Sequence, residues 1–306
     1  MKDYGRGPKT LNKINESIGE RIFSITTNIL MFILIIIFVL PFWAIIASSF
    51  VNEAESAQRG SFILWPSTFN FSAYNVLLSP NSMIYNAYSN TIFLVVVGTA
   101  ISLLMTSTMA YGLSKKMMPG RNAITAFVFF TMLFGGGLIP SFLLNRSLGL
   151  TNNVWALILP YMISPWNMFI MRNFFMEIPE SLEEAASIDG ASPPKVLFSI
   201  ILPISMPVMA TIGLFYAVGY WNSWFPAMIY INDIHKMPIQ NIMRNMIVAS
   251  SASDVTGSLT NESNKNLVAE TVKSATIVIS TLPIMCVYPF IQKHFVKGVM
   301  VGAIKG

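Results

Sequence analysis

The residues best placed to take part in chemistry are acidic, and they lie in the segment 178–203 between two hydrophobic stretches. Pro179 suits the first turn of a helix, and the carboxylates of Glu183 and Glu184 follow near the positive end of that helix. Gly190 suits the left-handed conformation that closes a helix. Acidic groups displayed in this way favour a charged contact with another protein.

Two alanines and a second helix start complete this pattern. Ala185 and Ala186 leave a thin helix that can enter a groove on another protein. Ser192 is typical of a helix N-cap, and Pro193 is typical of the first residue of the next helix. The segment is therefore predicted to form a helix–turn–helix, with Asp189 beside the turn. The alternative interpretation is a solvated connector between two membrane helices.

The sequence lacks the motifs that most other kinds of chemistry require. The sequence contains no G-x-x-x-x-G-K-[ST] loop for ATP phosphates and no H-E-x-x-H zinc motif. The hydrophobic stretches contain no Asp, Glu, Lys or Arg, whereas an ion-coupled carrier usually keeps an ionisable residue within the membrane. We therefore expect no catalytic residue, metal site or cofactor in this chain, and an energy source on another chain.

The composition is that of a membrane protein. Hydrophobic residues make up 54% of the 306 residues and charged residues 11%, less than half of the roughly 25% in soluble domains. Too few charges remain to cover a water-facing surface, so much of the exterior must face lipid. No basic block with interleaved aromatic residues indicates nucleic acid. The one cysteine, Cys286, excludes an internal disulfide.

Six charge-free stretches are long enough to cross a bilayer, which takes about 20 apolar residues per helix. With the N-terminus inside, the inner segments hold 13 Lys and Arg and the outer segments hold 6, so both termini are expected in the cytoplasm. The prediction is an all-α membrane protein with a basic tail 1–21, six helices within 22–293 and a tail 294–306. The stretches are 22–49, 86–113, 123–144, 153–171, 199–221 and 274–291.

Two outer connections are long, 50–85 and 222–273. The second contains a stretch rich in Ser, Thr and Asn, 249–266, which is expected to be mobile. A short amphipathic helix on the outer surface is predicted just before it, from four apolar residues at helical spacing: Ile239, Ile242, Met243 and Met246.

Glycines and prolines predict breaks within the stretches. The glycine run 135–137 either lines a pathway or breaks the third stretch and leaves 138–148 as a separate outer helix; the second interpretation is the simpler one. Kinks in the fifth and sixth stretches are predicted at four prolines: Pro203, Pro207, Pro283 and Pro289.

Aromatic and amide side chains are candidates for a substrate pathway, because sugar sites combine aromatic faces with amides that bond hydroxyl groups. Trp221 and Trp224 are three residues apart and are expected to share a helix face. An interfacial aromatic belt also explains the tryptophans, and this interpretation is favoured. The candidates are Trp166, Asn167, Trp221, Asn222 and Trp224.

The segment 178–203 resembles the EAA loop of binding-protein-dependent ABC importer permeases. The spacing agrees throughout, and the extended form over 183–192 looks like the carbohydrate branch. Four further segments look like the subgroup for uptake of complex polysaccharides or oligosaccharides: 134–140, 148–152, 221–225 and 297–306. The residues of the EAA pattern are Glu184, Ala185, Ala186, Gly190, Ile200, Leu202 and Pro203.

The resemblance implies the fold and partners of a type I ABC importer in a bacterial cytoplasmic membrane. A second, homologous permease subunit pairs with this chain, an external solute-binding protein delivers sugar or oligosaccharide, and an ATPase dimer receives the coupling helix. ATP and Mg belong to the ATPase, so this chain is expected not to be an enzyme. The implied ATPase contacts are Glu183, Glu184, Ala185, Ala186, Asp189 and Gly190.

Two other functions remain open. The same fold serves importers of amino acids, peptides or metal ions, and only the extended EAA form argues against such a cargo. A membrane-embedded glycan-processing enzyme would need acidic catalytic residues near the membrane surface, and the outer acidic residues form no recognisable site. Co-purification distinguishes an importer from the enzyme, because only an importer subunit brings an ATPase and a second permease with it.

Overall fold

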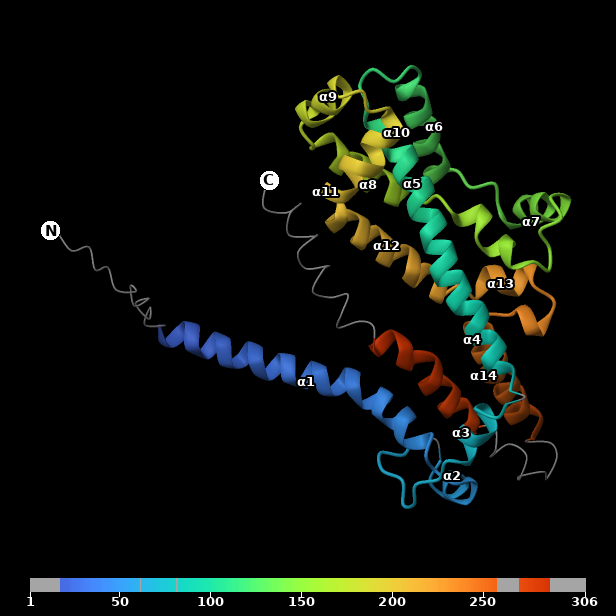
Figure 1. Cartoon of the computed structure of the whole chain (residues 1–306). Helices are drawn as coiled ribbons and strands as arrows, with labels where there is room; N and C mark the ends of the chain where they lie inside the picture. Colours follow the sequence, from blue (N-terminus) through green and yellow to red (C-terminus); the bar gives the residue numbers. More distant parts are fainter. Residues whose placement is uncertain (1–16, 61, 81, 258–269, 287–306) are drawn as a thin grey trace.

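The protein is a bundle of helices, several of which are bent or broken (Figure 1). The computed structural model describes residues 17–60, 62–80, 82–257 and 270–286. Within these ranges every regular element is a helix, which confirms the predicted all-α class for the described part of the chain.

The first helix, α1 (Ile18–Ser48), stands apart from the rest over most of its length (Figure 1). It begins with a capping box in which the side chains of Ser17 and Glu20 each accept a hydrogen bond from the backbone N–H of the other residue. Its buried side chains all lie near the C-terminal end: Ala44, Ala47 and Ser48. Within the described part of the chain, α1 is therefore attached to the bundle by that end.

The second stretch is one long helix with a π-helical turn in its middle. Two short helices, α2 (Glu53–Arg59) and α3 (Ser72–Leu77), precede it. The long helix itself consists of α4 (Met83–Phe93), η1 (Leu94–Gly98) and α5 (Thr99–Ser114). A Cβ atom at Gly98 would lie 2.8 Å from the ring of Tyr220, so this close approach requires glycine.

The third stretch is broken at its glycines, as the simpler interpretation predicted. α6 (Arg121–Leu133) ends before the glycine run 135–137, and α7 (Leu138–Ser147) follows at an angle of 117°. Gly137 has a φ of +87°, in the left-handed region that residues with a Cβ rarely adopt. The predicted separate helix over 138–148 is therefore confirmed.

The fourth stretch is not one helix over 153–171, and that expectation was wrong. Two short 3-10 helices, η2 (Val154–Leu157) and η3 (Leu159–Tyr161), are followed at 47° by α8 (Pro165–Met176). Pro160 and Pro165 explain the break, because neither can donate the backbone hydrogen bond of a helix interior.

The fifth stretch bends sharply between two of the predicted prolines. Its first part consists of α10 (Pro193–Val196), η4 (Leu197–Ile201) and α11 (Leu202–Ile204), and α12 (Met206–Trp221) follows at 88°. Pro203 and Pro207 lie on either side of this bend, so the kinks predicted there are confirmed. Pro289 lies outside the described residues.

The last outer connection corrects two expectations. It begins with α13 (Phe225–Tyr230) and η5 (Ile234–Lys236), and α14 (Ile239–Gly257) follows. The apolar face of α14 is not on the outer surface, because Ile239 and Ile242 are buried in a cluster with residues of α3 and α4. α14 also continues well into the stretch 249–266 that was expected to be mobile; residues 258–269 lie outside the described part.

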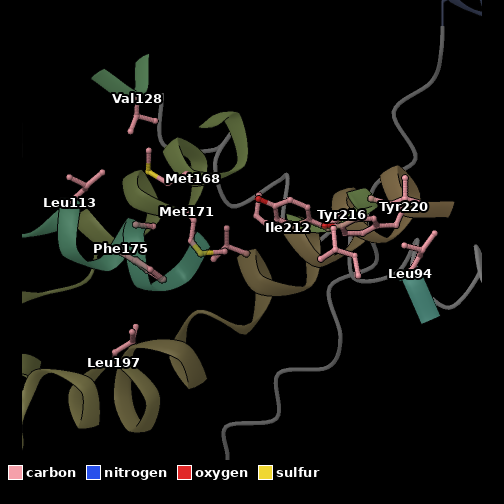
Figure 2. Close-up of a cluster of buried hydrophobic side chains, with 14 of the residues drawn as sticks. Leu94, Leu113, Val128, Met168, Met171, Phe175, Leu197, Ile212, Tyr216 and Tyr220 are labelled. Carbon is pink, nitrogen blue, oxygen red and sulfur yellow. The ribbon is translucent and has the colours of Figure 1, made fainter. Parts of the chain in front are cut away.

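The core of the bundle is formed mainly by α5, α8 and α12 (Figure 2). Buried hydroxyl groups pair across these helices: Tyr216 with Thr106 at 2.6 Å, and Tyr220 with Ser102 at 2.9 Å. In a lipid environment such bonds and close packing hold helices together. The large buried side chains include Leu113, Met168, Met171, Phe175 and Ile212.

The described helices account for up to five membrane spans. α1 and the helix 83–114 are each long and apolar enough to cross a bilayer. Three bent helix pairs are also long and apolar enough when each pair is taken as one span. The sixth predicted stretch, 274–291, is described only as far as residue 286, at the end of a helix 270–286. The count of six therefore stays a prediction.

Candidate coupling site and transport pocket

α9 (Glu180–Ile188) lies where the first helix of the predicted pair was expected, and it ends in a Schellman turn. The Gly190 N–H donates to the Ser187 carbonyl at 3.1 Å, and the Ala191 N–H donates to the Ala186 carbonyl at 2.9 Å. Gly190 has the predicted left-handed conformation, with a φ of +78°, and no atom lies within 4 Å of the position of a Cβ. The backbone conformation, not crowding, requires this glycine.

Two ion pairs attach one side of α9 to the turn that follows α5. The Lys115 ammonium donates a hydrogen bond to the Glu183 carboxylate, and Lys116 pairs with Glu180 at 2.9 Å. The Tyr111 hydroxyl donates to the other oxygen of Glu183 at 3.3 Å. The hydrogen bond from Lys116 lowers the pKa of the Glu180 carboxyl below its ordinary value.

Other side chains of α9 are exposed. Glu184, Ala185 and the C-cap residue Asp189 are exposed, and Ile188 is 86% exposed. Glu184 forms no ion pair with any described residue, whereas Ala186 is buried in the main core. The six predicted coupling residues thus divide: Glu183, Ala186 and Gly190 hold and shape α9, and Glu184, Ala185 and Asp189 are available to a partner.

A groove of about 810 Å³ lies between α9 and the turn at 115–117. Met117, which is 94% exposed, lines it together with Ile188. Its charged lining residues include two ion pairs, Lys115 with Glu183 and Lys116 with Glu180, so Glu184 is the one lining carboxylate without an ion pair to a described residue. Exposed apolar side chains beside this carboxylate suit a partner segment that carries both apolar and basic side chains.

A pocket of about 520 Å³ lies between α12 and the N-terminal end of α8. It contains three of the five predicted pathway residues: Trp166, Asn167 and Asn222. Trp166 is 63% exposed, so its ring face is accessible, while Asn167 is buried. None of the residues that line the pocket is charged. Aromatic faces next to amides and hydroxyls suit the ring and the hydroxyl groups of a sugar.

The two remaining candidates lie elsewhere. Trp221 is buried, with its ring centre 6.4 Å from that of Tyr88, and Trp224 lies beneath the guanidinium of Arg244 at 5.1 Å. α12 ends at Trp221, with Asn222 as its C-cap. The expected shared helix face of Trp221 and Trp224 is therefore wrong, because the helix stops before Trp224.

Tyr216 and Tyr220 also line the pocket, and sequence reasoning missed them. The Tyr216 hydroxyl accepts a hydrogen bond from the Ser164 N–H at 2.8 Å and is paired with Thr106, so it links α12 to α5 and to the start of α8. Two tyrosines four residues apart in a charge-free stretch were the available signal, because a phenol within a membrane needs a polar partner.

Comparison with known proteins identifies the family. The family described as "Binding-protein-dependent transport system inner membrane component" matches residues 17–301. The chain belongs to this family. It is therefore a permease component of the cytoplasmic membrane and works with transport proteins on other chains.

Similar permeases cover nearly the whole chain. The protein LplC of Bacillus subtilis is 48% identical over 88% of this chain and 90% of its own length. The polygalacturonan/rhamnogalacturonan transport system permease protein YtcP of Bacillus subtilis is 46% identical over 91% of this chain and 96% of its own length. A chain of a crystallised bacterial ABC transporter involved in the import of the acidic polysaccharide alginate is 35% identical, with a TM-score of 0.82 over 92% of this chain and 99% of the other.

α8 connects the two sites of the permease. Its first turn lines the pocket, and its last residue, Met176, lines the groove beside α9. At this end the Nε atoms of Arg121 and Arg172 each donate a hydrogen bond to the Leu113 carbonyl at 2.9 Å. The ends of α5, α6 and α8 are thereby joined directly beneath the coupling site.

Proposed function

We propose that this chain is one of two permease subunits of an ATP-driven importer that moves sugar or oligosaccharide into the cytoplasm. An external solute-binding protein delivers the substrate, and an ATPase dimer on the cytoplasmic side supplies the energy. The observation that carries the proposal is α9, a helix fixed by two ion pairs while its residues Glu184 and Ile188 stay exposed.

Coupling requires a contact that transmits force, and the described geometry supports one. Lys115 and Lys116 tie α9 to the end of α5, so the coupling helix cannot move without the membrane helices. In this proposal Glu184 bonds a basic residue of the ATPase, while Ile188 and Met117 fill apolar positions beside it. The basic residues of the N-terminal tail and of the 115–121 turn then face the cytoplasm.

The cargo is proposed from the pocket and from the names of two similar proteins. Those names refer to the transport of polygalacturonan or rhamnogalacturonan and to the import of the acidic polysaccharide alginate. Trp166 offers a ring face to the apolar side of a sugar, and Asn167 and Asn222 offer amides to its hydroxyl groups. The second permease subunit completes the pathway.

Cross-linking tests the coupling proposal and the membrane orientation together. Because Cys286 is the only cysteine, a Cys286→Ser background allows a single new cysteine at Ile188. We expect the Ile188→Cys protein to cross-link to the co-purified ATPase, since this side chain is displayed beside Glu184. Gln58→Cys on exposed α2 is the control and should not cross-link. An ATPase that co-purifies but cross-links only to position 58, or a chain that brings no ATPase, would contradict the proposal.

If sugar contacts the pocket, replacing Trp166 should affect sugar uptake more than replacing Trp224. Trp166→Ala removes a ring face from the pocket. The sugar concentration that gives half-maximal uptake should rise about 2–10-fold, because an aromatic contact contributes about 0.5–1.5 kcal/mol to binding. Trp224→Ala, a change of the same kind outside the pocket, should have little effect. Uptake of labelled oligosaccharides bound by the cognate binding protein measures both. Equal effects of the two variants would place the pathway elsewhere.

A further inference from the structure

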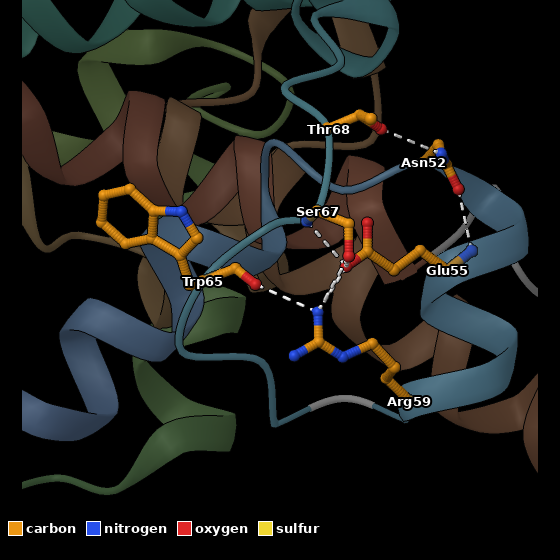
Figure 3. A network of polar contacts seen from close by, with 6 residues as sticks. All are labelled: Asn52, Glu55, Arg59, Trp65, Ser67 and Thr68. Carbon is orange, nitrogen blue, oxygen red and sulfur yellow. Dashed lines mark hydrogen bonds and ion pairs between the residues drawn. The ribbon is translucent and has the colours of Figure 1, made fainter.

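The connection between α1 and α3 is closed by a group of polar contacts around Glu55 (Figure 3). The Glu55 side chain is only 8% exposed, and one of its oxygens accepts hydrogen bonds from Arg59 at 2.5 Å and from the Ser67 N–H and hydroxyl at 2.9 and 2.7 Å. Arg59 also donates to the Trp65 carbonyl at 3.1 Å. We call Glu55, Arg59 and Ser67 the polar clasp; it ties the segment 62–69 to α2.

Large apolar side chains gather on this closed segment, beside the C-terminal part of α1. Trp65 stacks on Trp43 of α1 with ring centres 6.3 Å apart, and its edge contact with Phe69 has a centre distance of 6.1 Å. The indole N–H of Trp43 donates to the Leu64 carbonyl at 2.8 Å. These four residues, the aromatic patch, are 45–62% exposed.

The length of α1 places this patch relative to the membrane. Arg21 is the last charged residue of α1, and the 22 residues from there to Trp43 rise by about 33 Å at roughly 1.5 Å per residue. The hydrocarbon core of a bilayer is about 30 Å thick. With Arg21 at one boundary of the core, Trp43 lies at the other, and a helix tilt of about 20° shortens the rise by only about 2 Å.

We propose that the aromatic patch binds the lipid surface at the outer boundary between acyl chains and headgroups. Trp65 and Phe69 lie at the depth of Trp43 because they contact it or each other, and this is the depth that tryptophan prefers in membrane proteins. The segment 62–69 thus folds back to the membrane surface. The polar clasp, with its acidic and basic groups already paired to each other, lies on the water side.

Two further observations favour lipid over a protein as the occupant. The patch is continuous with the exposed apolar surface of α1, where the neighbouring Phe42 is 58% exposed. A protein partner recognises charge as well as apolar area, and the clasp pairs Arg59 with Glu55 internally. Lipid contact also explains how α1 keeps its direction, since its described contacts with the bundle are confined to its C-terminal end.

A fluorescent probe tests this depth in the assembled transporter, which is placed in phosphatidylcholine nanodiscs with other subunits free of cysteine. In the Cys286→Ser background, Phe69→Cys carries an environment-sensitive NBD label, and Gln58→Cys on α2 is the matched control. We expect NBD emission at position 69 to be blue-shifted and to be quenched several-fold more strongly than at position 58 by lipids with a nitroxide near the headgroup. A nitroxide at the end of the acyl chain should quench less. Trp65→Cys, labelled in the same way, provides a second measurement of the depth of the aromatic patch.

Each other outcome overturns the proposal. Quenching by aqueous iodide without quenching by nitroxide lipids would place the patch in water. Blue-shifted emission that neither quencher affects would place it under another protein chain, and stronger quenching by the deep nitroxide would place it within the hydrocarbon core. The measurement involves no transport, so its result is independent of the proposed sugar import.

Discussion

Gly190→Val is expected to abolish most sugar uptake while the permease reaches the membrane in normal amounts. The left-handed φ of +78° brings the Cβ of a β-branched residue against its own backbone, at a cost of about 1–2 kcal/mol. No neighbouring atom adds to this strain. We expect the turn to change its conformation to relieve the strain, so that α9 no longer fits the ATPase. Uptake, the amount in the membrane and co-purified ATPase are the three measurements.

Gly149 provides a matched control. It closes α7 with the same two backbone hydrogen bonds, from the Gly149 N–H to Arg146 and from the Leu150 N–H to Asn145, each 3.0 Å long. Its φ is +69°, and no atom lies within 4 Å of the position of a Cβ. Gly149→Val thus introduces the same backbone strain at a site remote from α9, and this variant should retain sugar uptake. If both variants lost uptake equally, or if Gly190→Val imported sugar at the parental rate, α9 would be only a connector.

α9 and the turn that follows it could be predicted from the sequence because their signals are local. Pro179 precedes its first turn, Gly190 closes it, and Ser192 with Pro193 starts the next helix; each residue acts through its own backbone conformation. The same holds for the glycine break after α6 and the proline bend before α12. Residues whose effect depends on φ alone need no knowledge of the tertiary structure.

The remaining features depend on contacts between distant segments. Glu183 and Glu184 are neighbouring acidic residues, and that Glu183 bonds within this chain follows only from the position of Lys115, 68 residues away. The pocket likewise depends on α12 meeting the start of α8, which Tyr216 and Ser164 join. The apolar face of α14 was assigned to the surface because an amphipathic pattern does not reveal whether lipid, water or another helix covers it.

The pocket and the coupling site lie at opposite ends of one short helix, which suggests how they communicate. α8 has 12 residues, its first turn is fixed by Tyr216 and its last is fixed near Leu113 by Arg172. A rigid helix held at both ends transmits a shift at one end to the other. Under the proposed function, a movement of α9 by the ATPase would reach the residues that line the pocket through α8 and the short link 177–179.

Exchanging the charges of Lys115 and Glu183 is expected to separate the residue that positions α9 from the residue that contacts the ATPase. Glu183→Lys places two ammonium groups side by side and should reduce uptake about tenfold or more, as the loss of a coupled pair of roughly 1.4 kcal/mol gives. Lys115→Glu should act in the same way. The double exchange restores opposite charges and should recover most of the uptake, because the partner of Glu183 lies within this chain.

Glu184→Lys is the comparison for this experiment. Glu184 is exposed and forms no ion pair with any described residue. Adding Lys115→Glu to Glu184→Lys should therefore not increase sugar uptake above that of Glu184→Lys alone. Its uptake should instead return with a charge reversal on the ATPase. A Lys115→Glu change that rescued both glutamate variants equally would mean that the two carboxylates act only through the net charge of α9, and the division between positioning and contact residues would fail.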